Sequence, residues 1–349
     1  MRLLNRQIQV ERSISVKAKN RTSPMPRTLL IFVTLQLLML RVNLCAQERD
    51  YSKYHNDINE AEKLIAEKNY GLALERYEAL IGDYEFLFQR DCKIAAQLSA
   101  HQDRTDLTFE FLTKGVLTGW ELKDIRINKS LKKIIQLPEW RAFEEQYAQL
   151  RVKYEAGLNS ELSARVKKMY SKDQKKAMGA LFRIGSKSQD NYAENKFAPH
   201  SEQQIKGLRD ILLQIGYPGE KLIGNDFWVS TILSHHNSIS EAYNKKDTLY
   251  PELKPLLTEA LSRGEVSPFE LALIDEWYRS TLGQGSYVGY GILDPPSKST
   301  LEETNALRAA IFLRSVETRN GLVDIQAETG IDFYLPGEGW IEGKIDIVP

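Results

Sequence analysis

The stretch that decides the fold is residues 57–80, DINEAEKLIAEKNYGLALERYEAL. Apolar residues recur every three or four positions in each half of it, which is the stripe of an amphipathic helix. An Asn-Tyr-Gly turn separates the two halves. Ala61 and Ala73 are small enough to let two antiparallel helices approach closely, while Tyr70 and Tyr77 fill the space near the turn. The stretch therefore predicts a tightly packed helical hairpin.

A second helical pair follows at a similar interval. Its apolar residues lie over 95–100 and 107–112, with a turn predicted at His101–Thr105. The segment after Trp120 is irregular and is expected to cover the apolar face of the last helix. This order resembles tetratricopeptide (TPR) repeats with an end-cap, and we assign the repeat domain to residues 50–150. The resemblance implies a protein or peptide partner in a concave groove. The alternative is that the repeats only dock onto the rest of the chain.

The N-terminal 46 residues have the layout of an export signal. Basic residues precede the apolar run Leu29–Leu40, which is shorter than the roughly 20 residues of a membrane span. Ala46 is small, as a cleavage site requires, and Met25 is an alternative start. We predict cleavage, export to the periplasm or cell envelope (or secretion), and no integral membrane span afterwards. A retained anchor is the alternative. Cleavage would leave Cys92 as the sole cysteine and exclude an internal disulfide.

The composition excludes one class of partner. The chain has 349 residues, enough for two domains, and equal numbers of basic and acidic residues, 47 of each. Nucleic-acid binders carry a basic excess or a basic face, so no nucleic-acid partner is expected.

The remainder of the chain is also predicted to be helical. We expect a bridging helix over 151–172, a C-terminal helical domain over 173–320 and an extended tail over 321–349. Helices are expected at 201–215, 226–243, 251–263 and 268–282, after a polar loop over 185–200. The tail from Ile331 to Ile341 is expected to form a small β-hairpin or an extended strap. The predicted fold is therefore mainly α, with a short repeat region and a second helical domain.

Several motifs of this second domain resemble a bacterial family. One motif consists of Gly216-Tyr217-Pro218, three further residues and Leu222-Ile223-Gly224. It resembles the GWPxxxLVG segment of the family catalogued as domain of unknown function 6624. The remaining landmarks follow in the family's order and lie at Asp173-Gln174, His235, Asp275, Gln284–Tyr287 and Arg308–Leu313. The resemblance covers about residues 165–320 and implies no activity, because none is established for the family.

The same landmarks supply the candidate site. The polar residues lie in otherwise apolar helices, and a buried charge without a partner is costly, so they should satisfy one another. We expect His235, Asp275 and Arg308 to face a common cavity, with Tyr287 at its rim and either Arg308 or His235 as the partner of Asp275. For Asp275 the favoured interpretation is a structural ion pair, and for His235 it is a helix-terminal histidine that hydrogen-bonds the last carbonyls. The full candidate set is Asp173, Gln174, His235, Asp275, Tyr287 and Arg308.

Other chemistry has no support in the sequence. His235 and His236 are adjacent, so they point about 100° apart and cannot face one metal as an i,i+4 pair would. No G-x-S-x-G elbow or phosphate-binding glycine loop occurs. We therefore expect no metal and no cofactor. Two hypotheses remain: an exported protein that binds a protein, peptide or small ligand, or an enzyme of unknown reaction that uses His235, Asp275, Tyr287 and Arg308.

Overall fold

The first helical hairpin consists of α3 (Tyr51–Ala66) and α4 (Tyr70–Asp83). The computed structural model describes residues 50–224, 227–283, 287–336, 341 and 343–349. The predicted signal, residues 1–46, lies outside them. Ala61 and Ala73 are fully buried, as the close approach of the two helices requires.

The second pair consists of α5 (Gln89–His101) and α6 (Thr105–Leu117), and the predicted turn lies between them. Trp120 then folds back over α6, where a Cβ on Gly115 would lie only 2.7 Å from the indole ring. The irregular cap follows as α7 (Leu122–Ile127) and two 3-10 turns, and it leads into α8 (Pro138–Gly157).

The bridge differs from the prediction of one helix over 151–172. Helix α8 ends at Gly157, and a new helix, α9 (Ser160–Leu181), begins at Ser160. Asn159 caps the N-terminus of α9, because its side chain accepts a hydrogen bond from the Leu162 N–H at 2.9 Å. The break is therefore a helix cap that the apolar periodicity does not reveal.

The C-terminal helices are α10 (Ser186–Tyr192), the π-helical turn η4 (Ala193–Phe197), α11 (Ala198–Gln214), α12 (Glu220–Ile223), α13 (Trp228–Asn237), α14 (Glu241–Asn244), α15 (Leu249–Ser262), α16 (Pro268–Gly283), α17 (Leu301–Ala310) and α18 (Val316–Thr329). Two predictions were wrong here. The polar segment 185–200 is mostly helical, and the helix expected over 226–243 is two helices. They part at Ser240, whose hydroxyl caps α14 by accepting from the Tyr243 N–H.

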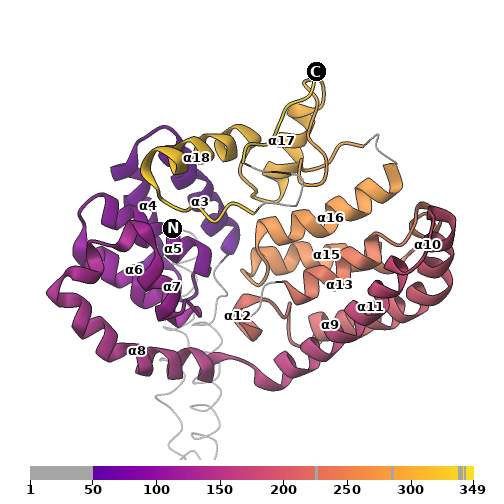
Figure 1. Cartoon of the computed structure of the whole chain (residues 1–349), viewed down its shortest axis with the longest axis horizontal. Coiled ribbons are helices and arrows are strands. Elements are labelled where there is room, and N and C mark those ends of the chain that lie inside the picture. The colour runs from indigo at the N-terminus through magenta and orange to yellow at the C-terminus, as the bar shows by residue number, and fades with distance from the viewer. Residues whose placement is uncertain (1–49, 225–226, 284–286, 337–340, 342) are drawn as a thin grey trace, which may run out of the picture. The chain divides into compact units, whose positions relative to one another are not determined.

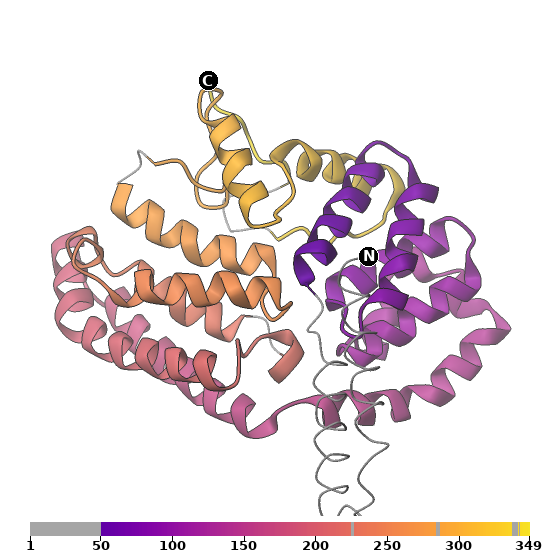
Figure 2. The same ribbon diagram turned by 180° about the vertical axis from the view of Figure 1, so that it is seen from behind.

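The apolar side chains form two main cores. One joins the repeat helices to the end of the chain, and the other lies among α9, α11, α13, α15 and α16. Figures 1 and 2 show α18, at the yellow end of the chain, lying along α3 at the indigo end. Residues 50–349 thus form one compact unit, in which the C-terminus completes the core of the repeats.

The tail is extended only from Gly330, since α18 occupies the residues before it. Phe333 is fully buried in the repeat core. Gln97 holds the strand-like segment by two hydrogen bonds to the backbone of Asp332, each of 2.9 Å. The β-hairpin is not formed in the described residues, where the sole β-contact is an isolated bridge between Ser297 and Val348. The fold is mainly α, as predicted.

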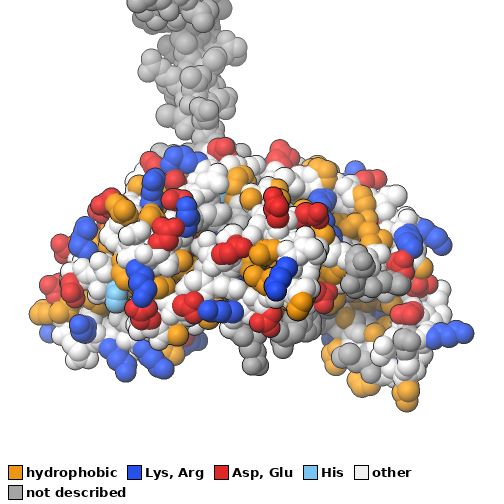
Figure 3. Space-filling model, turned by 90° about the horizontal axis from the view of Figure 1, so that it is seen from above, with side chains coloured by type: hydrophobic (Ala, Val, Ile, Leu, Met, Phe, Trp, Pro, Cys, Tyr) orange, Lys and Arg blue, Asp and Glu red, His pale blue; other side chains and the backbone are white. Residues whose placement is uncertain are grey.

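The surface is mixed in charge. Figure 3 shows acidic and basic side chains interspersed over one face, in keeping with a net charge of zero. In the described part of the chain, no helix combines the length and the apolar character that a membrane crossing requires.

Candidate functional site

A carboxylate and a histidine meet between α9 and α13. Nδ1 of His235 lies 2.5 Å from Oδ2 of Asp173, which comes from 62 residues earlier in the chain. The Asp173 side chain is fully buried, whereas 31% of the His235 side chain is exposed. The carboxylate therefore fixes the orientation of the imidazole, and Nε2 has no hydrogen-bond partner among the described residues.

The histidine of this dyad borders a cavity of about 310 Å³. Its wall includes His235 and Gln174, and the remaining lining residues are Ala177, Met178, Ala180, Ala193, Phe197, Ser238 and Ile239. Of the candidate set, Asp173 therefore contacts His235, and Gln174 and His235 line the same cavity. The second carboxylate oxygen of Asp173 is buried and has no hydrogen-bond partner in the described structure.

His236 points away from this cavity, as adjacent positions on a helix require. Its Nδ1 lies 3.0 Å from the Ser201 hydroxyl, and its Nε2 lies 3.4 Å from Oδ2 of Asp247. Asp247 also accepts from the N–H groups of Leu249 and Tyr250 at the start of α15. Burial favours the neutral acid, but the nearby His236 and the hydrogen bonds from these backbone groups hold the pKa of Asp247 below its usual value.

The contacts among Ser201, His236 and Asp247 have a structural role in the packing of the helices. Ser201 and His236 are both fully buried, so no substrate reaches the hydroxyl. The serine also lies within α11 and not on an exposed strand-to-helix turn, where a nucleophile would be presented.

Asp275 belongs to a separate cluster. It forms ion pairs with Lys254 and Arg279, each at 2.7 Å, and accepts hydrogen bonds from the hydroxyls of Tyr250 and Tyr290. Burial alone would raise its pKa, but the two cations lower it. The expected pairing with Arg308 or His235 was therefore wrong, and the structural ion pair is the correct interpretation.

Arg308 and Tyr287 also have other partners. Arg308 donates to the carbonyl oxygens of Tyr290 and Arg314 at 2.5 and 2.6 Å, so it fixes backbone. Burial and the nearby positive charge of Arg314 lower its pKa to about 9. The Tyr287 hydroxyl lies 3.2 Å from Oε1 of Glu276 and 3.1 Å from Oδ2 of Asp294, and its single proton is shared between these two acceptors.

The common cavity expected for His235, Asp275 and Arg308 is not found among the cavities that the described residues form. The cavity that His235 borders is lined by neither of the other two. The physical reason is the position of α13 between α9 and α16: His235 faces Asp173 on α9, whereas Asp275, on α16, turns toward α15.

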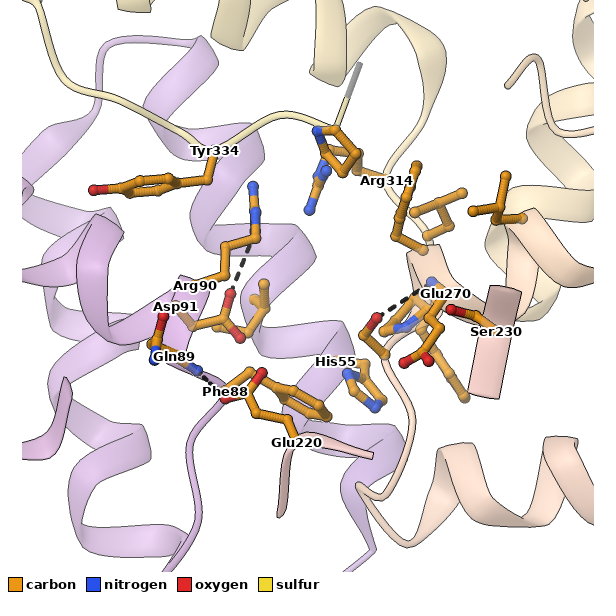
Figure 4. Close-up of a pocket in the computed structure, with 18 of the residues that line it drawn as sticks. His55, Phe88, Gln89, Arg90, Asp91, Glu220, Ser230, Glu270, Arg314 and Tyr334 are labelled. Atoms are coloured by element: carbon orange, nitrogen blue, oxygen red, sulfur yellow. Dashed lines mark hydrogen bonds and ion pairs between the residues drawn. The ribbon is translucent and has the colours of Figure 1, made fainter. Parts of the chain in front are cut away.

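A larger cavity, of about 470 Å³, lies where the repeat helices meet the C-terminal helices. Figure 4 shows its lining. Apolar walls come from both parts of the chain and include Ile58, Phe88, Phe227, Phe269, Leu273, Phe312 and Leu313. This size and this apolar lining are typical of a small-molecule site.

Two arginines line the cavity beside a buried glutamate. Glu62 of α3 is fully buried, and Nη1 of Arg90 lies 2.7 Å from its Oε1. Arg314 donates from Nε to the other oxygen. Nη1 of Arg90 also lies 3.3 Å from Asp91. Burial raises the pKa of Asp91, although Arg90 acts in the opposite direction.

Carboxylates line other parts of the wall. Glu270 accepts a hydrogen bond from the Tyr217 hydroxyl at 2.5 Å, and Glu220 accepts one from the Gln89 N–H at 2.6 Å. Glu265 pairs with Arg263 at 2.8 Å. In Figure 4, Glu270 lies across the cavity from Arg90 and Arg314. The cavity therefore presents charged groups of both signs together with apolar surface.

His55 lies between these groups. Its ring stacks on Phe312, with centroids 6.0 Å apart, and its Nε2 lies 3.3 Å from the Leu261 carbonyl oxygen. Burial lowers its pKa to about 4, so the ring is neutral at physiological pH. It acts as a polar but uncharged part of the wall.

Comparison with protein-family models, with curated proteins and with solved structures finds no match for this chain. The resemblances to TPR repeats and to the family of unknown function therefore stay predictions from the motifs. The described residues contain no group of three or more His, Cys, Asp or Glu side chains placed to hold a metal ion.

The larger cavity was missed from the sequence, although one signal was present. Glu62 occurs on the apolar stripe of α3, four residues after Ile58 and three before Ile65. A charged residue at such a position is buried when the helix packs, so it needs a cation from elsewhere. The periodicity does not say that Arg314, 252 residues away, supplies one.

Proposed function

We propose that this chain is an exported, non-catalytic binding protein whose ligand occupies the 470 Å³ cavity. The observation that carries the proposal is the lining: charged groups of both signs, set in apolar walls that two parts of the chain build together. The TPR-like repeats then act as one wall of the site, which combines their predicted binding and docking roles.

A thermal-shift screen of the mature protein tests this proposal, because a ligand that binds the folded state raises its melting temperature. Leu273→Trp fills part of the cavity and should remove the shift that any ligand of this site produces. The matched control is Leu213→Trp on α11, since Leu213 is exposed and lines neither described cavity. A ligand whose shift survives in Leu273→Trp binds elsewhere, and that result would contradict the proposal.

A second candidate function is acid–base catalysis by the dyad. The buried carboxylate orients the imidazole through Nδ1, and Nε2 is left for a substrate. This arrangement is typical of a general base. Hydrolysis of a panel of activated esters tests it. Asp173→Asn and His235→Gln should each lose activity, whereas His101→Gln, at an exposed position on α5, should keep it. Equal rates for all four proteins would refute this function.

A further inference from the structure

The end of α9 and the start of α10 carry a dense set of basic side chains. Between residues 168 and 187 only Asp173 is acidic, and its side chain is buried against His235. Six residues of this segment are basic, and all of them are exposed: Lys168, Lys172, Lys175, Lys176, Arg183 and Lys187. None of the six forms an ion pair with an acidic residue that the structure describes. This segment, the basic tip, is therefore strongly cationic in a chain whose net charge is zero.

The basic tip also exposes large apolar side chains where α9 ends. Phe182, the C-cap residue of α9, is 78% exposed, and Ile184 is 97% exposed. Lys168, Lys175 and Phe182 follow one another at intervals of seven residues, which is about two helical turns. The three residues therefore lie on one face of the helix, with the apolar residue at its end.

The conformation of the basic tip is held by α10, which folds back on α9. The Tyr192 hydroxyl donates to the Lys176 carbonyl oxygen at 3.0 Å. Gly179 leaves the space for this contact, since a Cβ at that position would overlap the hydroxyl. The Arg183 guanidinium lies over the Tyr192 ring, 5.3 Å from its centroid. Figures 1 and 2 show α10 and the end of α9 at the outer edge of the C-terminal helices.

An anionic lipid surface complements both features of the basic tip. Lipid phosphates attract lysine and arginine side chains, and the boundary between headgroups and acyl chains buries apolar side chains that water would otherwise surround. Exposed apolar groups with a polar rim mark contacts with a membrane or another macromolecule. A nucleic acid would complement the charge, but it offers no apolar layer to bury Ile184.

We propose that the mature protein binds peripherally to anionic membranes through the basic tip. Phe182 and Ile184 enter the boundary between headgroups and acyl chains, and the surrounding lysines contact the lipid phosphates. No residue of the basic tip lines the 470 Å³ cavity, so this inference is independent of the ligand proposed for that cavity.

Co-sedimentation of the mature protein with lipid vesicles measures this binding. The protein should bind vesicles of equal parts phosphatidylglycerol and phosphatidylcholine. It should bind vesicles of phosphatidylcholine alone about tenfold more weakly or less, because they lack net negative charge. Added NaCl should weaken the binding to the anionic vesicles, since salt screens exposed charges.

Two double variants separate the apolar and basic contributions. Phe182→Ser combined with Ile184→Ser removes the apolar side chains. Lys168→Gln combined with Lys175→Gln removes two charges from the same face. Each double variant should weaken binding to the anionic vesicles by about tenfold or more. All four side chains are exposed, so the urea midpoint should stay near that of the wild type.

Matched controls lie elsewhere on the surface. Leu213→Ser replaces an apolar residue that is 59% exposed on α11. Lys132→Gln combined with Lys133→Gln removes two exposed charges from the cap of the repeats. Both controls should bind the anionic vesicles as the wild type does.

A double-stranded DNA oligonucleotide provides the comparison with nucleic acid. If the protein binds this DNA through Lys168 and Lys175, and the double serine variant binds vesicles as tightly as the wild type, the basic tip is a nucleic-acid surface and the proposal fails. No binding to the anionic vesicles, or equal binding by the wild type and both double variants, would also overturn it.

Discussion

Replacing Glu62 with glutamine should remove the charge that holds two parts of the chain together. Glu62 lies on α3, is fully buried and lies between Arg90 and Arg314. Burial would raise its pKa, but the two arginines outweigh that effect and lower it. Glutamine keeps the shape of the side chain and leaves the two guanidinium groups without their shared anion.

The expected loss is large for a single substitution. Removing one partner of a buried ion pair costs about 3–5 kcal/mol, because the remaining charges stay buried without compensation. Domain stabilities are about 5–15 kcal/mol, so this is a substantial part of the total. Urea titration followed by circular dichroism would show it as a lower midpoint. Glu60→Gln, on the exposed side of the same helix, should change the stability by about 0.5 kcal/mol or less.

The pH dependence gives an independent signature. Because the folded pKa of Glu62 lies below its unfolded value, its contribution is complete above the unfolded pKa and is lost as the pH falls through the folded pKa. The stability difference between the wild type and Glu62→Gln should therefore shrink in acid. A difference below about 1 kcal/mol at neutral pH would refute the argument that this carboxylate compensates two buried arginines.

Four further predictions follow from individual features. Ala73→Arg should destabilise the mature protein by about 2 kcal/mol or more, because the helix crossing leaves no room for the side chain; an unchanged urea midpoint would contradict this. Wild-type stability should fall by up to about 3 kcal/mol between pH 6.5 and 4, because His55 is protonated in the unfolded chain over this range, whereas the buried ring stays neutral. His55→Gln should reduce this dependence of the unfolding free energy on pH. Phe333→Ala should cost about 3–5 kcal/mol in the same titration if the strap completes the repeat core, and a cost near zero would show that the strap is detached. Intact-mass measurement of protein from the envelope fraction should show a chain without residues 1–46, whereas a chain that keeps Leu29–Leu40 would indicate an anchor.

Of the candidate site, the sequence motifs indicated only the part in which the motif residues contact each other. Asp173, Gln174 and His235 were singled out from the sequence; Asp173 contacts His235, and Gln174 and His235 line one cavity. Asp275 was correctly expected to need a partner. Its partners, Lys254 and Arg279, could not be chosen, because many cations in the chain would satisfy a buried carboxylate equally well.

The sequence by itself determined the helical class and the first hairpin. The apolar periodicity and the two alanines lie within about 20 residues, so these local signals can be recognised without knowledge of the rest of the chain. Only the tertiary structure decided that α18 and the segment around Phe333 complete the repeat core, and that Arg314 reaches Glu62 to build the larger cavity. These contacts join residues more than 200 positions apart, and burial makes them favourable only once both ends have been brought together by packing.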